Sequence, residues 1–372
     1  MKSNYDVLGN HIQLVDRRNG ELITDKVLGI NIDKFFMPSV ANVIGTDLSK
    51  YKLIVKGTFA CNPMHVGRDE RLPVALYTED EPAIVSPAYF MFEIKKDSEL
   101  LPAYLMMWFR RPEFDRNCWF RTDGSVRGGI TWDDICRLEV PVPSKAEQEA
   151  VIASYKAIDD RIALKQKIND NLEDQMKAIF DEYVVSNDAY EYDEALDDSI
   201  DFINGLAMQN FRPEENDTAL PVIKIRELSQ GCCDANSEYC TSEIDSTHII
   251  NNGDLVFSWS GSLQAAIWTA GTAGLNQHLF KVQSSKYPLW FVYRWVIYHL
   301  LNFQRIAENK GTTFGHIKRE DLHSALIKSL NNDQISRLNK IFNPLIIAAI
   351  ENSTELHRLM DLQRVLLAQL SR

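Results

Sequence analysis

The chain has 372 residues, of which 45% are apolar and 25% are charged, and its formal net charge is −12. This length and composition are typical of a globular protein of two or three domains and exclude a disordered chain. The most apolar stretch, residues 287–303, contains Arg294 and His299, so it predicts a buried helix and no membrane span. No apolar signal-peptide core is found near Met1, and six cysteines without framework spacing favour the reduced cytoplasm.

Residues 1–143 alternate short apolar runs with polar turns, which predicts a globular domain of mixed helix and strand structure. Residues 51–60 predict two strands with a turn at Gly57. Residues 83–95 predict extended chain, and residues 102–111 predict an amphipathic helix.

Residues 144–186 predict one long helix. Ser144 followed by Glu147 is a capping-box pattern, and the apolar residues that follow are mostly three or four apart, with one interruption at Lys165 and Gln166. A helix of about 40 residues is about 60 Å long, at 1.5 Å per residue. Its narrow apolar seam needs a partner helix, which we expect to be contacted by Ile152, Tyr155, Ile162, Leu172 and Met176.

The acidic excess is concentrated after this helix. Residues 187–217 contain ten acidic residues and one basic residue, whereas the rest of the chain is close to neutral. We expect this segment to be a solvated connector that stays away from nucleic acid. Because counterion release depends on the contacting surface, the net charge does not exclude DNA binding by the flanking domains.

The second half repeats the plan of the first. We expect its globular domain to start near residues 202–211. Residues 220–228, 254–259 and 265–270 predict strands, and residues 287–308 predict a helix.

A second long seam begins near residue 331. Asn343 followed by Pro344 fits an N-cap and a first helical position, so we expect a short helix, a break and then a long helix. Asn352 and Glu355 fall on the seam, whose apolar residues are Leu345, Leu359, Leu362 and Leu366. Two matching seams predict a coiled-coil-like rod. The alternative is that each helix packs on its own globular domain.

An internal repeat supports the helix pair. Residues 123–135 align with residues 310–322 at an offset of 187, and Glu147-Gln148 aligns with Asp333-Gln334 at an offset of 186. Half of the chain is 186 residues, which predicts a tandem duplication. The predicted fold class is therefore α+β, duplicated, with two long helices that form a rod.

A family resemblance rests on the duplicated plan of a globular domain followed by a long helix, and on the opening of the first domain at residues 27–39 and 51–57. Three further patterns support it. A glycine-centred turn, a short helix and a strand lead from Gly124 to Pro143, and the first long helix starts with Glu147-Gln148. Asn252-Gly253-Asp254-Leu255-Val256 starts a strand in the second domain. In this order the chain resembles the specificity subunit of a type I restriction-modification system, although the second copy lacks the prolines of Val140-Pro141-Val142-Pro143.

The resemblance implies a division of the chain into parts. Residues 1–143 would be the first target-recognition domain and residues 144–186 the first spacer helix. Residues 187–330 would be the acidic connector and second target-recognition domain, and residues 331–372 the second spacer helix. Each domain would read one half-site of a bipartite double-stranded DNA target, and the helices would set the spacer.

The resemblance also implies partners. Two methyltransferase subunits would dock on the helices, and motor-nuclease subunits would complete a cytoplasmic complex without a membrane. S-adenosylmethionine, ATP and magnesium would bind those partners and not this chain, which would be non-enzymatic. Two alternatives remain open: a scaffold whose globular parts bind protein, and a recognition subunit of another DNA-modifying defence complex.

DNA recognition needs cations at phosphates and polar side chains at base edges. Basic residues lie around the glycine turns of both copies, in a turn-rich segment of the first domain and on a predicted strand of the second. For each, the alternative is a solvated surface cation. The candidates are Arg68, Arg71, Arg121, Arg127, Lys224, Arg226, Lys310, Lys318 and Arg319.

Motifs for catalysis and metal binding are weak. Asn62-Pro63-Met64-His65 is not the Asn/Asp-Pro-Pro-aromatic loop of an adenine methyltransferase. Glu93-Ile94-Lys95 with Asp80 upstream has the form of a nuclease triplet, which is common by chance. No zinc pattern matches the spacing of Cys232, Cys233, Cys240 and His248. We therefore predict no catalytic residue and no metal ligand.

Overall fold

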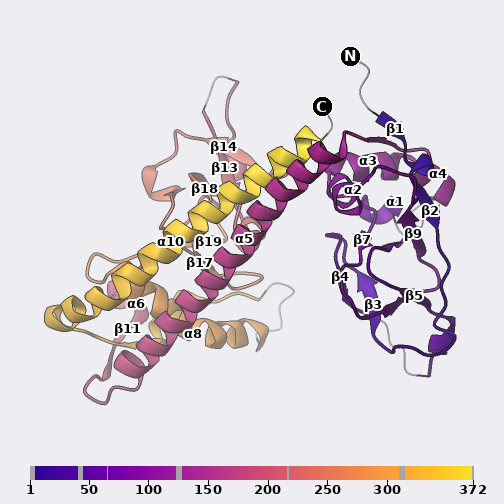
Figure 1. Ribbon diagram of the computed structural model, residues 1–372. Helices are drawn as coiled ribbons and strands as arrows, with labels where there is room; N and C mark the ends of the chain where they lie inside the picture. The colour runs from indigo at the N-terminus through magenta and orange to yellow at the C-terminus, as the bar shows by residue number, and fades with distance from the viewer. Residues whose placement is uncertain are drawn as a thin grey trace. The chain divides into compact units, whose positions relative to one another are not determined.

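The computed structural model describes residues 5–40, 45–64, 66–122, 128–215, 218–309 and 315–370. The chain forms two compact units (Figure 1). Unit 1 consists of residues 1–160 and 361–372, and unit 2 consists of residues 161–360. The chain thus leaves unit 1 through the first long helix and returns to it at the end of the second.

The described part of unit 1 contains ten strands in three sheets. The strand orders are β2-β9-β6-β7, β4-β3-β8-β5 and β1-β10, and all neighbours are antiparallel except β3 and β8. The strands are β1 Tyr5–Val7, β2 Ile12–Leu14, β3 Val27–Ile30, β4 Phe36–Pro38, β5 Lys52–Ile54, β6 Phe59–Cys61, β7 Val74–Leu76, β8 Ala83–Val85, β9 Phe90–Ile94 and β10 Glu139–Pro141.

The helices of unit 1 cover these sheets. α2 buries six of its eight residues, so it is a core helix rather than an amphipathic one. Pro112 starts the next helix, because proline fits the first turn, where its missing N–H would have no partner. The helices are α1 Val66–Asp69, α2 Pro102–Phe109, α3 Pro112–Phe120 and α4 Trp132–Cys136, with 3₁₀ turns η1 Leu8–Asn10 and η2 Leu48–Lys50.

Unit 2 repeats the strand order of unit 1. Its sheets are β12-β19-β16-β17, β14-β13-β18-β15 and β11-β20, and β13 and β18 form its parallel pair. The strands are β11 Tyr192–Ala195, β12 Asp201–Asn204, β13 Ala219–Ile223, β14 Tyr239–Thr241, β15 Ile249–Ile250, β16 Leu255–Ser258, β17 Ala265–Ile267, β18 Ala273–Leu275, β19 Leu279–Gln283 and β20 Leu326–Lys328. Every strand of unit 1 thus has a counterpart ten strands later, which confirms the predicted duplication.

The helices of unit 2 differ from those of unit 1 mainly after the last long strand, where one helix, α8, replaces two. The elements are α6 Leu196–Ser199, α7 Ile225–Gln230, α8 Leu289–Asn309 and α9 Arg319–His323, with 3₁₀ turns η4 Met208–Asn210 and η5 Ser246–His248.

A pair of phenylalanines lies across the central strands of each unit. Phe59 in β6 stacks on Phe92 in β9, with ring centroids 5.0 Å apart. Phe257 in β16 lies opposite Phe280 in β19, with centroids 6.3 Å apart. Aromatic cross-strand pairs stabilise sheets, so an equivalent contact holds the central strands together within each unit.

The long helices are α5 Lys145–Phe180, which continues as a π-helical turn Asp181–Val185, and α10 Asn332–Gln369. The predicted capping box is present, since Ser144 N donates to Glu147 Oε2 at 2.9 Å. In α10, Asn331 N donates to Gln334 Oε1 at 2.7 Å. The two boxes are 187 residues apart, so the offset of 186 that we predicted here is wrong and no residue has been lost.

The helices pack on both units. In unit 1, Tyr155 of α5 and Leu367 and Leu370 of α10 belong to one buried cluster. In unit 2, Met176 of α5 and Phe342 of α10 belong to another. The predicted rod and its alternative are therefore combined, because the helices pack on globular cores as well as on each other.

Within unit 2 the two helices run antiparallel along each other (Figure 1), and polar side chains join them. Lys165 Nζ donates to Asn352 Oδ1 at 2.7 Å and lies 2.6 Å from Glu355 Oε2. Asn352 Nδ2 donates to Lys165 O at 2.8 Å and to Asn169 Oδ1 at 2.7 Å. We call Lys165, Asn169, Asn352 and Glu355 the polar centre. The interruptions that we noted in the two predicted seams therefore match each other.

The predicted break in the second helix is wrong. α10 runs without interruption through Pro344. A proline inside a helix costs about 3 kcal/mol, because it removes one hydrogen bond and crowds the preceding turn. Phe342 and Ile346 on either side are buried in the core of unit 2, and this packing offsets the cost.

Two further predictions need correction. Residues 220–228 are not one strand, because β13 ends at Ile223 and α7 begins at Ile225. Residues 187–217 are not a bare connector, because they supply β11, α6 and β12 and bury Leu196 and Phe202 in the core of unit 2. We did not predict these few buried apolar residues because acidic residues dominate the segment.

Candidate nucleic-acid interface

Each unit anchors a glycine-containing segment on the end of a central strand. In unit 1, Ile130 N donates to Pro63 O at 3.1 Å, two residues past β6, and Gly67 N donates to Gly128 O at 2.9 Å. A Cβ on Gly129 would lie only 3.0 Å from Pro63 O. Glycine thus lets the two backbones cross closely at the strand end.

The same crossing recurs in unit 2, just past β16. Ile317 N donates to Trp259 O at 3.0 Å, and Gly261 N donates to Gly315 O at 2.8 Å. A Cβ on Gly315 would lie 2.7 Å from Ala307 O, so a side chain there would collide with α8. The close backbone crossing is therefore present in both copies of the repeat.

In unit 2 the crossing borders an open pocket of about 570 Å³. Its polar contacts are internal: Ser260 Oγ lies 3.1 Å from His278 Nδ1, and Trp259 Nε1 donates to Gln277 O at 3.2 Å. We call it the strand-end pocket; its lining residues are Ile225, Trp259, Ser260, Gly261, His278 and His316.

Two predicted DNA-binding cations of unit 1 are held in surface ion pairs. Arg68 Nε lies 2.6 Å from Asp69 Oδ1, and Arg71 Nη1 lies 3.0 Å from Asp33 Oδ1. The hydrogen bond to Asp69 raises the pKa of Arg68. Exposed pairs of this kind contribute about 0–1 kcal/mol, so a phosphate can compete for the cation.

The two predicted cations near β13 are also paired. Lys224 is the N-cap of α7 and lies beside Glu238, and Arg226 in α7 lies 3.0 Å from Asp234. The hydrogen bond from Arg226 lowers the pKa of Asp234 to about 2. The prediction that Lys224 and Arg226 lie on a strand is wrong, because β13 ends before them.

The remaining described candidates are all exposed but differ in their contacts. Arg319 donates to Phe202 O at 2.7 Å and lies over the Phe280 ring, so it stabilises the domain. Arg121 and Lys318 are exposed, and no ion pair joins either of them to a carboxylate in the described residues. The last two lie outside the described residues: Arg127 and Lys310.

Comparison with known proteins gives distant but consistent relatives. The chain is 23% identical over 278 residues to the specificity subunit of the type I restriction enzyme MjaIX from Methanocaldococcus jannaschii, a match that covers 66% of this chain and 63% of that protein. It is 28% identical over 138 residues to the specificity subunit of the type I restriction enzyme EcoBI from Escherichia coli, covering 36% of this chain and 27% of that protein. Each match spans less than two thirds of the relative's length.

A solved structure has the same fold over nearly the whole chain. The S subunit of a type I restriction-modification system from M. genitalium matches with a TM-score of 0.58 at 13% identity, covering 99% of this chain and 96% of that one. The chain resembles type I specificity subunits. No protein-family model matches it. The resemblance that the sequence predicted is thereby confirmed, as is its α+β fold with long helices.

Only some of the side chains that we predicted for the seams of the two long helices are buried. Tyr155 and Met176 are buried, whereas Leu362 is 52% exposed. Leu362 is not part of the buried cluster of unit 1, to which Leu367 and Leu370 belong. The other predicted seam residues are intermediate in exposure: Ile152, Ile162, Leu172, Leu345, Leu359 and Leu366.

The nuclease-like triplet is not assembled as a catalytic site. Glu93 Oε1 accepts from Arg17 Nη2 and Thr58 Oγ1, both at 2.7 Å. Lys95 Nζ donates to Gly9 O at 2.8 Å, and Asp80 pairs with Lys56 at 2.6 Å. These contacts hold strands and loops of unit 1, so the triplet is structural.

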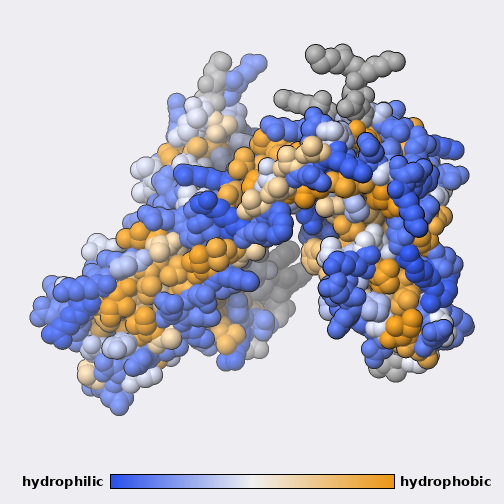
Figure 2. All heavy atoms as spheres, viewed as in Figure 1, coloured by the Kyte–Doolittle hydropathy of each residue, from blue (hydrophilic) through white to orange (hydrophobic). Residues whose placement is uncertain are grey.

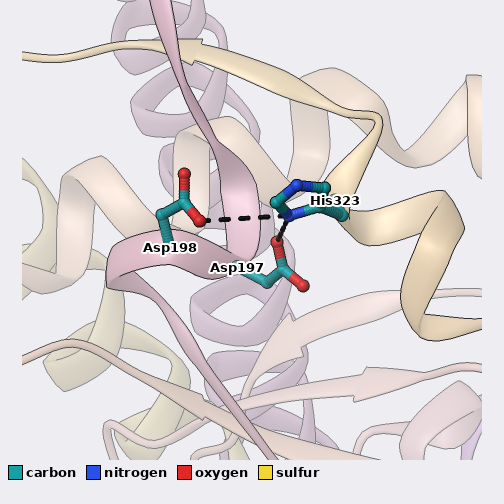
Figure 3. Close-up of side chains that lie close together, drawn as sticks. All are labelled: Asp197, Asp198 and His323. Atoms are coloured by element: carbon teal, nitrogen blue, oxygen red, sulfur yellow. Dashed lines mark hydrogen bonds and ion pairs between the residues drawn. The ribbon is translucent and has the colours of Figure 1, made fainter.

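One group in the described residues has the spacing of metal ligands: Asp197, Asp198 and His323, whose candidate ligand atoms lie within 4.8 Å of one another (Figure 3). His323 Nδ1 lies 2.9 Å from Asp197 Oδ1 and 3.9 Å from Asp198 Oδ1. Asp198 also accepts from Ala195 N at 3.1 Å. These contacts join α6 to α9, which explains the cluster without a metal. The cysteines that we considered do not form such a group among the described residues: Cys232, Cys233 and Cys240, with His248.

Sequence analysis missed the strand-end pocket. Trp259, His278 and His316 are far apart in the chain and only the sheet brings them together. A weak signal was present, because Trp259 ends the predicted strand 254–259 and His316 follows the glycine turn that we had singled out. In the described residues, no helix combines the length and apolar character needed to cross a bilayer.

Proposed function

We propose that this chain is the DNA-recognition subunit of a type I restriction-modification complex in the cytoplasm. Each unit reads one half-site of a bipartite double-stranded target. The observation that carries the proposal is the duplicated ten-strand order with different side chains at the strand ends. Two copies of one strand arrangement can read two different half-sites, because the buried strands keep the same order in both units while the side chains at the strand ends differ.

Phosphate contacts position each unit on DNA. Arg121 in unit 1 and Lys318 in unit 2 are exposed beside the glycine segments. The paired cations Arg71 and Lys224 can exchange a carboxylate for a phosphate, because their ion pairs are at the surface. Such contacts give affinity that falls as salt rises.

The long helices set the spacing between the half-sites. The 36 residues of α5 correspond to about 54 Å at 1.5 Å per residue. The polar centre fixes the register of α5 on α10, as a buried polar residue does in a coiled coil. In this proposal the DNA between the half-sites is spanned and not read.

The helices also dock the partners. Two methyltransferase subunits, which methylate adenine with S-adenosylmethionine, bind exposed apolar positions of α5 and α10. Figure 2 shows hydrophobic residues along these helices on the viewed face. Motor-nuclease subunits supply the sites for ATP and magnesium, and this chain supplies no catalytic residue. The exposed large apolar residues of α5 and α10 are Leu164, Ile168, Ile341, Ile347, Met360, Leu362 and Val365.

Methylation mapping at single-base resolution tests the proposal. We would compare cells that express the chain with its neighbouring methyltransferase subunit and cells that express the methyltransferase alone. The expected result is a methylated motif of two short half-sites separated by an unread spacer, present only with this chain. Unchanged methylation, with both proteins expressed and soluble, would contradict the proposal and favour a scaffold.

A further inference from the structure

The strand-end pocket is a binding site without an assigned role. Its lining combines an apolar wall, Ile225 and Trp259, with two imidazoles, His278 and His316. None of its six lining residues is acidic, although the chain carries 52 acidic residues. A concave apolar surface with a few polar groups is the usual form of a small-ligand site, and the missing carboxylates favour an electron-rich or anionic ligand.

The ring of Trp259 is held in a fixed orientation. Its Nε1 donates to Gln277 O at 3.2 Å, and its ring lies 6.0 Å from the Phe280 ring by centroid distance. The indole N–H is therefore satisfied inside the domain. What the half-buried indole offers the pocket is apolar ring surface, which suits stacking.

His278 supplies a hydrogen-bonding edge beside that ring. Its centroid lies 5.9 Å from that of Trp259, and its Nδ1 lies 3.1 Å from the hydroxyl of the buried Ser260. This contact fixes the orientation of the imidazole and leaves Nε2 at the exposed side, 3.5 Å from Gln277 Nε2. A neutral imidazole nitrogen can donate or accept, depending on its tautomer.

Gly261 keeps the pocket open. Its φ of +65° is in the left-handed region, and a Cβ there would lie 3.2 Å from Ile225 Cδ1, across the pocket lining. Any other residue would be strained and would fill the space between α7 and the strand end.

Basic residues are neighbours in the sequence of two residues that line the pocket. Lys224 and Arg226 flank Ile225, and Lys318 is two residues after His316. Lys318 is exposed, and Lys224 has only a surface pair with Glu238. A ligand with an aromatic body and a phosphate backbone would satisfy both the ring and the cations.

We propose that the strand-end pocket binds one nucleobase of the half-site that unit 2 reads. The base packs on Trp259, its edge hydrogen bonds to His278 Nε2, and the adjoining phosphate contacts Lys318. This inference rests on the proposed function, and it names the specificity-determining residues of unit 2. Unit 1 has Asn62, Pro63 and Met64 at the matching crossing and so reads its half-site by other contacts.

The test is methylation mapping of three variants in the complex with the methyltransferase subunit. His278→Ala and Trp259→Ala should each lower the preference for one base pair, in the same half-site, by about tenfold, as expected for loss of one good base contact. Trp259→Phe keeps an aromatic face and should retain most of the preference. The other half-site should be unchanged.

A matched control is His323→Ala, since His323 is an exposed histidine of unit 2 outside the pocket, and it should leave the motif unchanged. Because Trp259 also packs on Phe280, the melting temperature of each variant is measured, and the exposed His278 serves as the variant that leaves the core intact. An unchanged motif in His278→Ala and Trp259→Ala, with wild-type methylation intact, would overturn the inference alone. No motif in the wild type would overturn the proposed function instead.

Discussion

Unit 1 and unit 2 have the same strand order but differ in the helical region that follows β9 and β19. In unit 1, α2 ends at Phe109 and α3 begins at Pro112. At the offset of 187, unit 2 has His299, which lies inside the single 21-residue helix α8. A proline can start a helix but disfavours its interior. The comparison shows that buried strand pairing keeps the same strand order in both units. Single residues, such as the proline, change where the helices that pack on these strands begin and end.

The two units also share the long helices unequally. Unit 1 receives the start of α5 and the end of α10, and unit 2 receives the end of α5 and the start of α10. Phe342, near the start of α10, is fully buried in unit 2, and Leu367, near its end, is buried in unit 1. One helix therefore contributes to two cores, and substitutions along it should affect different units.

The largest effect should come from the central phenylalanines. Phe59 and Phe257 are fully buried, so replacing either with alanine should destabilise its own unit by about 3–5 kcal/mol. Hydrogen exchange resolved along the chain measures this, with faster exchange expected in β6 and β9 for Phe59→Ala and in β16 and β19 for Phe257→Ala. Phe120→Ala, at an 87% exposed side chain, is the control. Equal loss of protection in both units would mean that they unfold as one.

Leu367→Ala should have the next largest effect. Leu367 is 8% exposed and lies near the end of α10, so the expected cost is about 2–3 kcal/mol, at the low end for a core leucine. The loss should appear in unit 1, although Leu367 is 187 residues beyond Phe180, the last residue of α5. Val365→Ala, at a 53% exposed position of the same helix, should change little. Lost protection in unit 2 with unit 1 intact would contradict the assignment of this helix end.

The sequence predicted well those features that depend on local chemistry or on the repeat. The capping box at Ser144 and the turn between β5 and β6 were readable from residues near one another, and the duplication was readable from the alignment of the two halves. It failed where packing outweighs local preference. Pro344 stays inside α10 because its neighbours are buried, and the acidic segment after Asn187 folds because it carries a few apolar anchors.

The candidate interface was harder to predict for the same reason. Arg71 and Arg226 were visible as cations, but their ion pairs with Asp33 and Asp234 depend on tertiary contacts. Trp259 and His278 are adjacent only because β16 pairs with β19. Periodicity assigns a residue to a face of its element, but it does not tell which element lies next to that face.

Substitutions in and beside the polar centre test which contacts hold the two long helices in register. Asn352 is 8% exposed, and its side-chain groups bond to Lys165 and Asn169. Asn352→Ala leaves these part-buried groups without their partner and should cost about 1–3 kcal/mol in unit 2. Arg161→Ala, which removes only an exposed pair with Glu355, should cost about 0.2–1 kcal/mol. Urea denaturation of the two variants measures both, and equal costs would show that the centre is no more than a surface network.

The smallest effect concerns the residue that distinguishes α8 from α2 and α3. Burial lowers the pKa of His299, and the hydrogen bond from Nε2 to Leu326 O at 2.9 Å opposes this only in part. The folded chain therefore binds the His299 proton less readily than the unfolded chain, whose histidine titrates near about 6.5. The contribution to stability is complete above that pH and is lost as the pH falls below it.

His299→Gln can keep a donor to Leu326 O and removes the titration, so it should flatten the decline in unit 2 stability as the pH falls below about 6.5. Denaturation at several pH values, followed by a probe in unit 2, measures the slope. Unit 1 has Pro112 at this position and should show no such change in the variant. The same slope in wild type and variant would mean that His299 is as easily protonated in the folded chain as in the unfolded one. Stability would then not depend on proton binding at His299. The two units would differ at this position only in helix geometry, because a histidine allows α8 to continue where Pro112 starts a new helix.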